Sequence, residues 1–355
     1  MMNDATLRAP APRLRYSLIA AFVGAAAMLG GCVSADSQQV PQRAALAAAP
    51  MAAPMKGWQS PLRATHPLVG RIWEVESGRY LSAKELVEAL ATKRFVLLGE
   101  KHDNPDHHSL QLALVDALAS SGRLAGISFE MLASPITPRL KTLPTRTFES
   151  ANALAAYLEW DDRGWDWELY GPLVKRVVDL RIPIAAGNIS RDQMSAMYSP
   201  ASDEADKSAA PRSQQPLSSD ALASLRADID TSHCGMLPES QFDAMLRVQQ
   251  GRDLEMARSL MTLPSAAGVR VLIAGNYHTR QDIGVPNYLL AADSARAPAL
   301  ERGDVVNVSL LEVAAGELEP AAYLETSLGQ VSADYLWFTP ALSDKDYCAS
   351  LRGEG

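Results

Sequence analysis

The sequence has few of the features that define several large classes of protein. It contains three cysteines, too few for a disulfide-rich scaffold, and its Lys and Arg (33) are outnumbered by Asp and Glu (41). Binding to a nucleic-acid backbone requires a basic surface, so the net charge of -8 argues against nucleic acid as a partner. No His-Glu-x-x-His motif and no cysteine pair at zinc spacing is present. The remaining composition, 47% hydrophobic and 21% charged, is typical of a globular protein.

The N-terminus has the layout of a bacterial export signal. Three arginines precede an apolar run over residues 17–29, which is shorter than the ~20 residues that span a bilayer. The run closes on Leu-Gly-Gly-Cys, which resembles a lipobox and predicts cleavage of residues 1–31 and lipid attachment to Cys32. Val33, rather than Asp, follows the cysteine, and by resemblance to sorted lipoproteins this favours an outer-membrane anchor. The alternative is an ordinary export signal with an incidental cysteine.

The rest of the chain divides into a linker and one body. Residues 32–67 are rich in Ala, Pro, Gln and Ser without a hydrophobic period, so we interpret them as a flexible tether. Residues 68–355 are compatible with a single domain and show no internal repeat. Within this domain, the polar stretch 199–220 is expected to form a surface loop.

The body alternates short apolar runs with helical patterns. We expect strands at 94–100, 125–131, 182–186, 269–275 and 305–313, and helices at 104–120, 170–180 and 239–263. Continuous apolar strands with helices between them predict an α/β fold, in which helices cover both faces of a mostly parallel central sheet.

Polar residues stand at, or directly after, the ends of four of the predicted strands. They are Glu100 with His102, Glu130, Asn188 and His278. Right-handed crossovers place the carboxyl ends of parallel strands along one edge, where ligands of open α/β sheets bind. We therefore interpret these residues as parts of one site.

Two predicted helices add polar residues to this site. His107 recurs with the leucines of its helix and should point inward, whereas His108 lies on another face and is expected at the surface. Arg252 interrupts the apolar face of the long helix, and a buried arginine needs a partner. We expect it to reach one of the two rim glutamates; an internal pair with Asp253 or a rotated helix is the alternative.

These residues lie in ordered blocks that resemble the ChaN-type haem-binding lipoproteins. The blocks are Leu98–Asn104 with His107, Trp167–Tyr170 with Pro172, Ile184–Asn188 with Arg191, Cys234–Gly235 with Pro238, Gln249–Ala257, and Ile273–His278 through Pro286. They cover most of the chain from about Phe95 to Leu289. Tyr277 departs from the family pattern, which usually has a small residue before the histidine.

The resemblance implies a membrane-anchored protein of iron uptake that binds haem as a facing pair between two subunits. It also implies a tyrosine as axial ligand, and phenolate is a hard anion suited to ferric haem. Tyr170, in a tryptophan-rich block, is our first choice of ligand and Tyr198 the second, although either could instead be a core or interface residue. His102, His107, Arg252 and His278 are the other residues expected near the haem. An outer-membrane haem receptor would be a further partner.

The same blocks resemble a wider superfamily with erythromycin-esterase-like and TraB/TIKI-like members. In that interpretation Glu100, His102, Glu130 and His278 hold a divalent metal or activate water, and the protein is a metal-dependent hydrolase. We favour a binding protein and leave enzyme activity open. A third alternative is that the rim residues are polar for structural reasons only.

The two remaining cysteines, Cys234 and Cys348, would both face an oxidising compartment. A disulfide between them is one interpretation, and a contact of His233-Cys234 with haem or metal is another. Sequence alone does not place the two sulfur atoms, so both stay open.

The lipobox yields the first prediction. Cys32→Ser should leave an uncleaved precursor without lipid, because the residue that carries the acyl chains is gone. Labelling cells with radioactive palmitate tests this, with the wild-type chain as the positive control. Label on the Cys32→Ser variant would contradict the lipoprotein hypothesis.

Overall fold

An eight-stranded sheet, in the order β2-β1-β8-β7-β3-β6-β4-β5, organises the described residues. The computed structural model describes residues 57–198, 216–265, 268–293, 299–324 and 331–352. The strands are β1 (Ile72–Glu74), β2 (Arg79–Leu81), β3 (Phe95–Glu100), β4 (Leu124–Ala133), β5 (Ile184–Asn188), β6 (Val269–Gly275), β7 (Val305–Glu312) and β8 (Tyr335–Thr339). The six strands from β8 to β5 pair in parallel, and β1 and β2 add an antiparallel edge.

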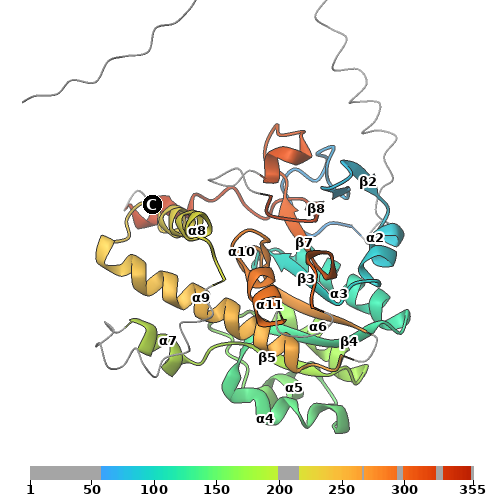
Figure 1. The fold of residues 1–355 in the computed structure, drawn as a ribbon. Coiled ribbons are helices and arrows are strands. Elements are labelled where there is room, and N and C mark those ends of the chain that lie inside the picture. Colours follow the sequence, from blue (N-terminus) through green and yellow to red (C-terminus); the bar gives the residue numbers. More distant parts are fainter. Residues whose placement is uncertain (1–56, 199–215, 266–267, 294–298, 325–330, 353–355) are drawn as a thin grey trace, which may run out of the picture. The chain divides into compact units, whose positions relative to one another are not determined.

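Helices join the strands and cover both faces of this sheet (Figure 1). They are α2 (Ala83–Leu90), α3 (Pro105–Ser120), α4 (Thr137–Leu140), α5 (Ala151–Leu158), α6 (Trp167–Asp179), α7 (Arg191–Tyr198), α8 (Ser219–Ser232), α9 (Glu239–Thr262), α10 (Asn276–Thr279), α11 (Val285–Asp293) and α12 (Tyr347–Leu351). The predicted α/β fold with a mostly parallel sheet is confirmed. Within the described part of the chain, no helix combines the length and hydrophobicity needed to cross a membrane.

The central strand β3 shows how the core is divided. Its side chains alternate between the faces, as the pleat of a strand requires. Val96 and Leu98 pack with α2, α3, α5 and α6, whereas Phe95 and Leu97 pack with α8, α9 and α11. Every residue of β3 is buried, because both faces of the sheet are covered.

A capped helix start follows β3. The Asn104 side chain accepts hydrogen bonds from the backbone N–H groups of Asp106 and His107, and Pro105 occupies the first turn. Such a cap contributes about 1 kcal/mol to helix stability. The cap fixes the point at which the chain turns from the end of β3 into α3, next to the polar residues of the predicted site.

Two segments differ from the expected boundaries. The strand expected at residues 182–186 lies at Ile184–Asn188, so the polar Asn188 belongs to the strand itself. Of the expected tether, residues 57–67 pack on the domain, since the backbone N–H groups of Gln59 and Ser60 donate to the Asp106 carboxylate at 2.8 and 2.9 Å. The signal peptide, the rest of the tether and residues 199–215 of the expected loop lie outside the described residues.

A disulfide joins Cys234 to Cys348, with their Cα atoms 5.6 Å apart, and so decides between the two interpretations of these cysteines. We call residues 341–352 the C-terminal strap. The strap leaves β8, pairs with Leu62 through Ala341, and donates from the Tyr347 hydroxyl to Asp103 at 3.0 Å. The disulfide then fixes the strap to the turn between α8 and α9.

The disulfide generates a stability prediction. It closes a loop with a sequence separation of 114 residues, and the chain-entropy model gives about 4–5 kcal/mol for a loop of that size. Dithiothreitol should therefore lower the urea midpoint of the wild-type protein strongly. A Cys234→Ser, Cys348→Ser double variant is the control, and its midpoint should be unaffected by the reductant. An unchanged wild-type midpoint after complete reduction would contradict the prediction.

Candidate functional site

We use the term rim for the edge of the sheet at which β7, β3, β6, β4 and β5 end. The first cluster on it surrounds the buried carboxylate of Glu100, the last residue of β3. Glu100 Oε1 accepts a 2.7 Å hydrogen bond from the Tyr170 hydroxyl and lies 3.0 Å from His102 Nδ1. Glu100 Oε2 lies 3.2 Å from His108 Nδ1. Because α3 supplies His108 and α6 supplies Tyr170, this carboxylate ties two helices to the end of a strand.

The second cluster surrounds the buried imidazole of His278 in α10. Its Nδ1 lies 2.6 Å from Asp253 Oδ1, and its Nε2 lies 3.4 Å from Glu130 Oε1. The side-chain amide of Gln249 lies 3.1 Å from Nδ1. Glu130 also accepts a 2.9 Å hydrogen bond from the backbone N–H of Gly275. The cluster therefore joins α9, α10, β4 and β6.

Mutual attraction keeps His278 and Glu130 ionised over a wide pH range. Burial alone would lower the pKa of His278, but Glu130 and Asp253 on either side raise it to about 10. Burial alone would raise the pKa of Glu130, but His278 and His102 lower it to about 2. Burial dominates at Asp253 and raises its pKa to about 6. An imidazolium between two carboxylates is the form that this geometry stabilises.

His102 connects the two clusters. Its side chain is 44% exposed, with Nδ1 held by Glu100. Burial lowers the pKa of His102, but the hydrogen bond to Glu100 and the charge of Glu130 raise it overall. A Cβ atom added to Gly275 would lie 2.8 Å from His102 Nε2, so only glycine allows the imidazole to approach β6 this closely. The structure thus brings Glu100, His102, Glu130 and His278 together on the rim.

Tyr170, our first choice of iron ligand, is enclosed by aromatic rings. His108 packs edge-on against it, with ring centroids 4.4 Å apart, and Trp160 and Trp165 each lie 6.0 Å away. The residue is 1% exposed, and burial together with Glu100 raises the pKa of its hydroxyl far above the usual value. The hydroxyl group of Tyr170 therefore acts inside the protein as the hydrogen-bond donor to Glu100.

Three predicted positions need correction or relocation. His108 is buried rather than at the surface, and its Nε2 donates to the carbonyl oxygen of His102 at 2.9 Å. His107 points inward as expected but away from the clusters, bonding Thr339 Oγ1 and the backbone N–H of Lys101. Arg252 does not reach Glu100 or Glu130 in the structure; its Nη2 lies 3.7 Å from the sulfur of Met194 in α7. The polar face of α9 is turned so that Asp253, not Arg252, enters the site.

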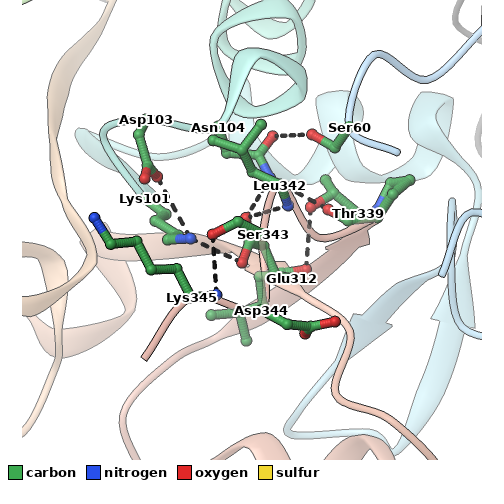
Figure 2. Close-up of polar contacts among 12 residues, drawn as sticks. Ser60, Lys101, Asp103, Asn104, Glu312, Thr339, Leu342, Ser343, Asp344 and Lys345 are labelled. Atoms are coloured by element: carbon green, nitrogen blue, oxygen red, sulfur yellow. Dashed lines mark hydrogen bonds and ion pairs between the residues drawn. The ribbon is translucent and has the colours of Figure 1, made fainter. Parts of the chain in front are cut away.

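A third polar cluster, which sequence analysis missed, centres on Glu312 at the end of β7 (Figure 2). Glu312 Oε2 accepts from Lys101 Nζ at 3.0 Å, and Oε1 accepts from Asn104 Nδ2 at 2.8 Å. The backbone N–H of Leu342 in the strap donates to the same Oε1 at 2.9 Å. The only sequence signal for Glu312 was its place at the end of a predicted strand. The cluster fixes the strap to the rim.

A cleft of about 630 Å³ opens at the ends of β4 and β5. Apolar side chains such as Met131 and Trp160 form part of its wall. The arginines Arg139, Arg163 and Arg191 also line it, next to acidic neighbours. Small-molecule sites of proteins occupy about 300–1,000 Å³. The described residues include no group of three or more His, Cys, Asp or Glu placed to hold a metal ion.

Comparison with known proteins agrees with this geometry. Residues 86–289 match the family model described as haem-binding uptake, Tiki superfamily, ChaN. A solved structure of cofacial haem binding to ChaN of Campylobacter jejuni is 25% identical to the chain, with a TM-score of 0.58. The alignment covers 75% of this chain and 95% of that one. The fold and the rim thus define a protein of the Tiki superfamily, and the chain belongs to its ChaN-type haem-binding uptake family.

More distant similarities extend over comparable lengths. A mutant of the erythromycin esterase EreC in its open conformation is 13% identical, with a TM-score of 0.42, and the match covers 74% of this chain and 94% of that one. The toxin effector domain RRSP from Vibrio vulnificus is also 13% identical, with a TM-score of 0.36 over 64% of this chain and 35% of that one. A search of curated proteins finds no significant match.

The ion pairs of His278 generate a pH prediction. His278 contributes stability that is fully present below its unfolded pKa of 6.5 and is lost as the pH rises through about 10. Glu130 contributes stability that is present above its unfolded pKa of 4.5 and is lost as the pH falls through about 2. His278→Gln should therefore lower the free energy of unfolding most near pH 6.5, where Asp253 is also ionised, and progressively less toward pH 10 and toward pH 2.

Urea unfolding at a series of pH values measures this loss. His107→Gln is a matched control, because burial keeps the pKa of His107 well below 6.5. The contribution of a neutral buried histidine decreases as the pH falls below 6.5, which is the opposite trend. A loss at His278→Gln that follows the trend of His107→Gln would show that the imidazole is neutral in the folded protein.

Proposed function

We propose that the protein binds haem at the rim, in the cleft between the ends of β4 and β5. The observation that carries the proposal is this cleft of about 630 Å³ at the ends of β4 and β5, in a chain of the haem-binding uptake family. Haem supplies iron and a flat porphyrin, and the role of the chain is to hold both. The proposed process is haem or iron acquisition.

The residues of the cleft fit the chemistry of haem. A porphyrin face requires apolar and aromatic contacts, which Met131, Ile136 and Trp160 provide. Propionate carboxylates pair with guanidinium groups, and Arg139 and Arg191 lie in the same wall. The buried Glu130–His278 pair has its own partners, Asp253 and the backbone N–H of Gly275, so the haem needs to contact only the lining of the cleft.

A tyrosine would supply the axial ligand, and burial weighs against our first choice. The Tyr170 hydroxyl donates to Glu100 at 2.7 Å, so its use as a ligand would break a buried hydrogen bond and open an aromatic cage. Tyr198, our second choice, is 47% exposed at the end of α7, and its hydroxyl contacts the sulfur of Met245 at 2.9 Å. An exposed phenol is the better donor.

The proposal also covers the oligomeric state of the protein and its location in the cell. In this proposal two copies of the chain hold their haems face to face, as in the cofacial arrangement described for ChaN of Campylobacter jejuni. Lipid on Cys32 anchors the protein to the outer membrane, where a haem receptor is the expected partner. Exposed side chains next to the rim, Tyr198 and Tyr277, give the second copy apolar surface to cover.

A hydrolase remains the second candidate, favoured by one specific contact. His102 is half-exposed, and its Nδ1 lies 3.0 Å from the buried Glu100 carboxylate, which is how a carboxylate orients a general base. In this alternative His102 would take a proton from water, while Glu130 and His278 supply charge nearby. Binding of a divalent metal by the same four residues would require them to leave their present partners.

Hemin titration tests the proposed function. The purified full-length protein should give a saturable, red-shifted Soret band with ferric hemin, and its elution volume should shift to that of a dimer only when hemin is present. Arg191→Ala should weaken hemin binding about two- to fivefold, the scale of one exposed ion pair. Arg226→Ala, which removes an arginine outside the cleft, should leave it unchanged. Without saturable binding by the wild-type protein, the hydrolase becomes the leading function.

A further inference from the structure

The charged side chains that line the cleft balance one another. They are the arginines Arg139, Arg163 and Arg191 and the carboxylates Glu159, Asp161 and Asp192. Their formal charges sum to zero at neutral pH. An anionic ligand therefore finds no net positive charge in the cleft unless an arginine gives up its present partner.

Asp161 is the carboxylate that pairs with two of these arginines. Arg191 Nη2 donates to Asp161 Oδ2 at 2.7 Å, and Arg163 Nε lies 3.6 Å from Asp161 Oδ1. Desolvation alone would raise the pKa of Asp161, but the hydrogen bond from Arg191 and the charges of both arginines lower it. Each oxygen of this ionised carboxylate thus faces a guanidinium, as an oxygen of a ligand carboxylate would.

The backbone holds Asp161 in this position without a ligand. Asp161 lies in the segment between α5 and α6, where its carbonyl oxygen accepts hydrogen bonds from the backbone N–H groups of Gly164 and Trp165, both at 3.0 Å. The indole N–H of Trp160 closes the same turn by donating to the carbonyl oxygen of Trp165 at 2.7 Å. Arg191, in contrast, is the first residue of α7, and its side chain is 76% exposed. Its guanidinium can therefore exchange partners without breaking a buried contact.

We propose that Asp161 occupies the place of a carboxylate of the ligand, which has to displace Asp161 from Arg191 in order to bind. The inference rests on the proposed haem-binding function and concerns the acidic edge of the ligand. One charge-assisted hydrogen bond replaces another in this exchange, so the gain in free energy is small. Asp161 thus keeps the affinity for acidic ligands moderate, and the cleft can release its ligand as well as hold it.

Titration of the full-length protein with metal-free protoporphyrin IX, followed by fluorescence, tests the exchange. This probe carries the propionates of haem but no iron, so its affinity reports on the cleft and not on an axial ligand. Asp161→Asn keeps the shape of the side chain and removes its charge. It should bind the porphyrin about two- to fivefold more tightly, the scale of one exposed ion pair. Asp162→Asn removes the same charge from the next residue, which does not line the cleft, and should leave the affinity unchanged.

Two comparisons separate this exchange from a general effect of charge. The dimethyl ester of protoporphyrin IX has no carboxylate, so Asp161→Asn should bind it as tightly as the wild type does. In an Arg191→Ala background, Asp161→Asn should lose most of its gain, because the guanidinium that it releases is absent.

Four results would overturn the inference while haem binding stands. They are equal or weaker porphyrin binding by Asp161→Asn, an equal gain for the ester, an equal gain in Asp162→Asn, and a full gain in the Arg191→Ala background. Ferric hemin is titrated into the wild type in parallel. No saturable binding of hemin would instead overturn the proposed function, and the inference with it.

Discussion

The pairing of one imidazole with two buried carboxylates holds the rim together. His278 lies between Glu130 on β4 and Asp253 on α9, and all three side chains are buried. Removal of one member would leave an uncompensated charge inside the protein, which typically costs about 3–5 kcal/mol. The position of α9 on the sheet is therefore tied to the protonation of a residue from α10.

The rim clusters and the neighbouring cleft differ in how their polar groups are used. The charges of the Glu100 and His278 clusters are satisfied by their own partners, so they need no ligand to remain folded. Met131 and Trp160 in the neighbouring cleft have apolar surface available for one. A flat, mainly hydrophobic molecule with acidic groups at its edge would complement both the wall and the arginines around it.

Much of this could be predicted from the sequence, for physical reasons that also set the limit. The apolar runs in the sequence predicted that Glu100 and Glu130 lie at the same edge of the sheet, because the last residues of parallel strands lie along one edge. The short strands β1 and β2 carry too few residues to show a pattern. The prediction that His108 lies at the surface was wrong because α3 is buried on more than one side. The apolar stripe of this helix therefore does not mark a single inner face. Arg252 and Asp253 are neighbours in α9, so a rotation of this helix about its axis by the angle between two successive residues decides which of them enters the site.

The disulfide closes a covalent ring that contains only part of the site. Cys234 and Cys348 close a ring that contains Asp253 and His278, whereas Glu130 lies outside it. A cut within the ring would leave the two pieces of the chain linked through the disulfide. Any local opening that moved α10 away from β4 would part His278 from Glu130 and leave a carboxylate unpaired. The fluctuations of the ring are thus opposed by an ion pair that crosses its boundary.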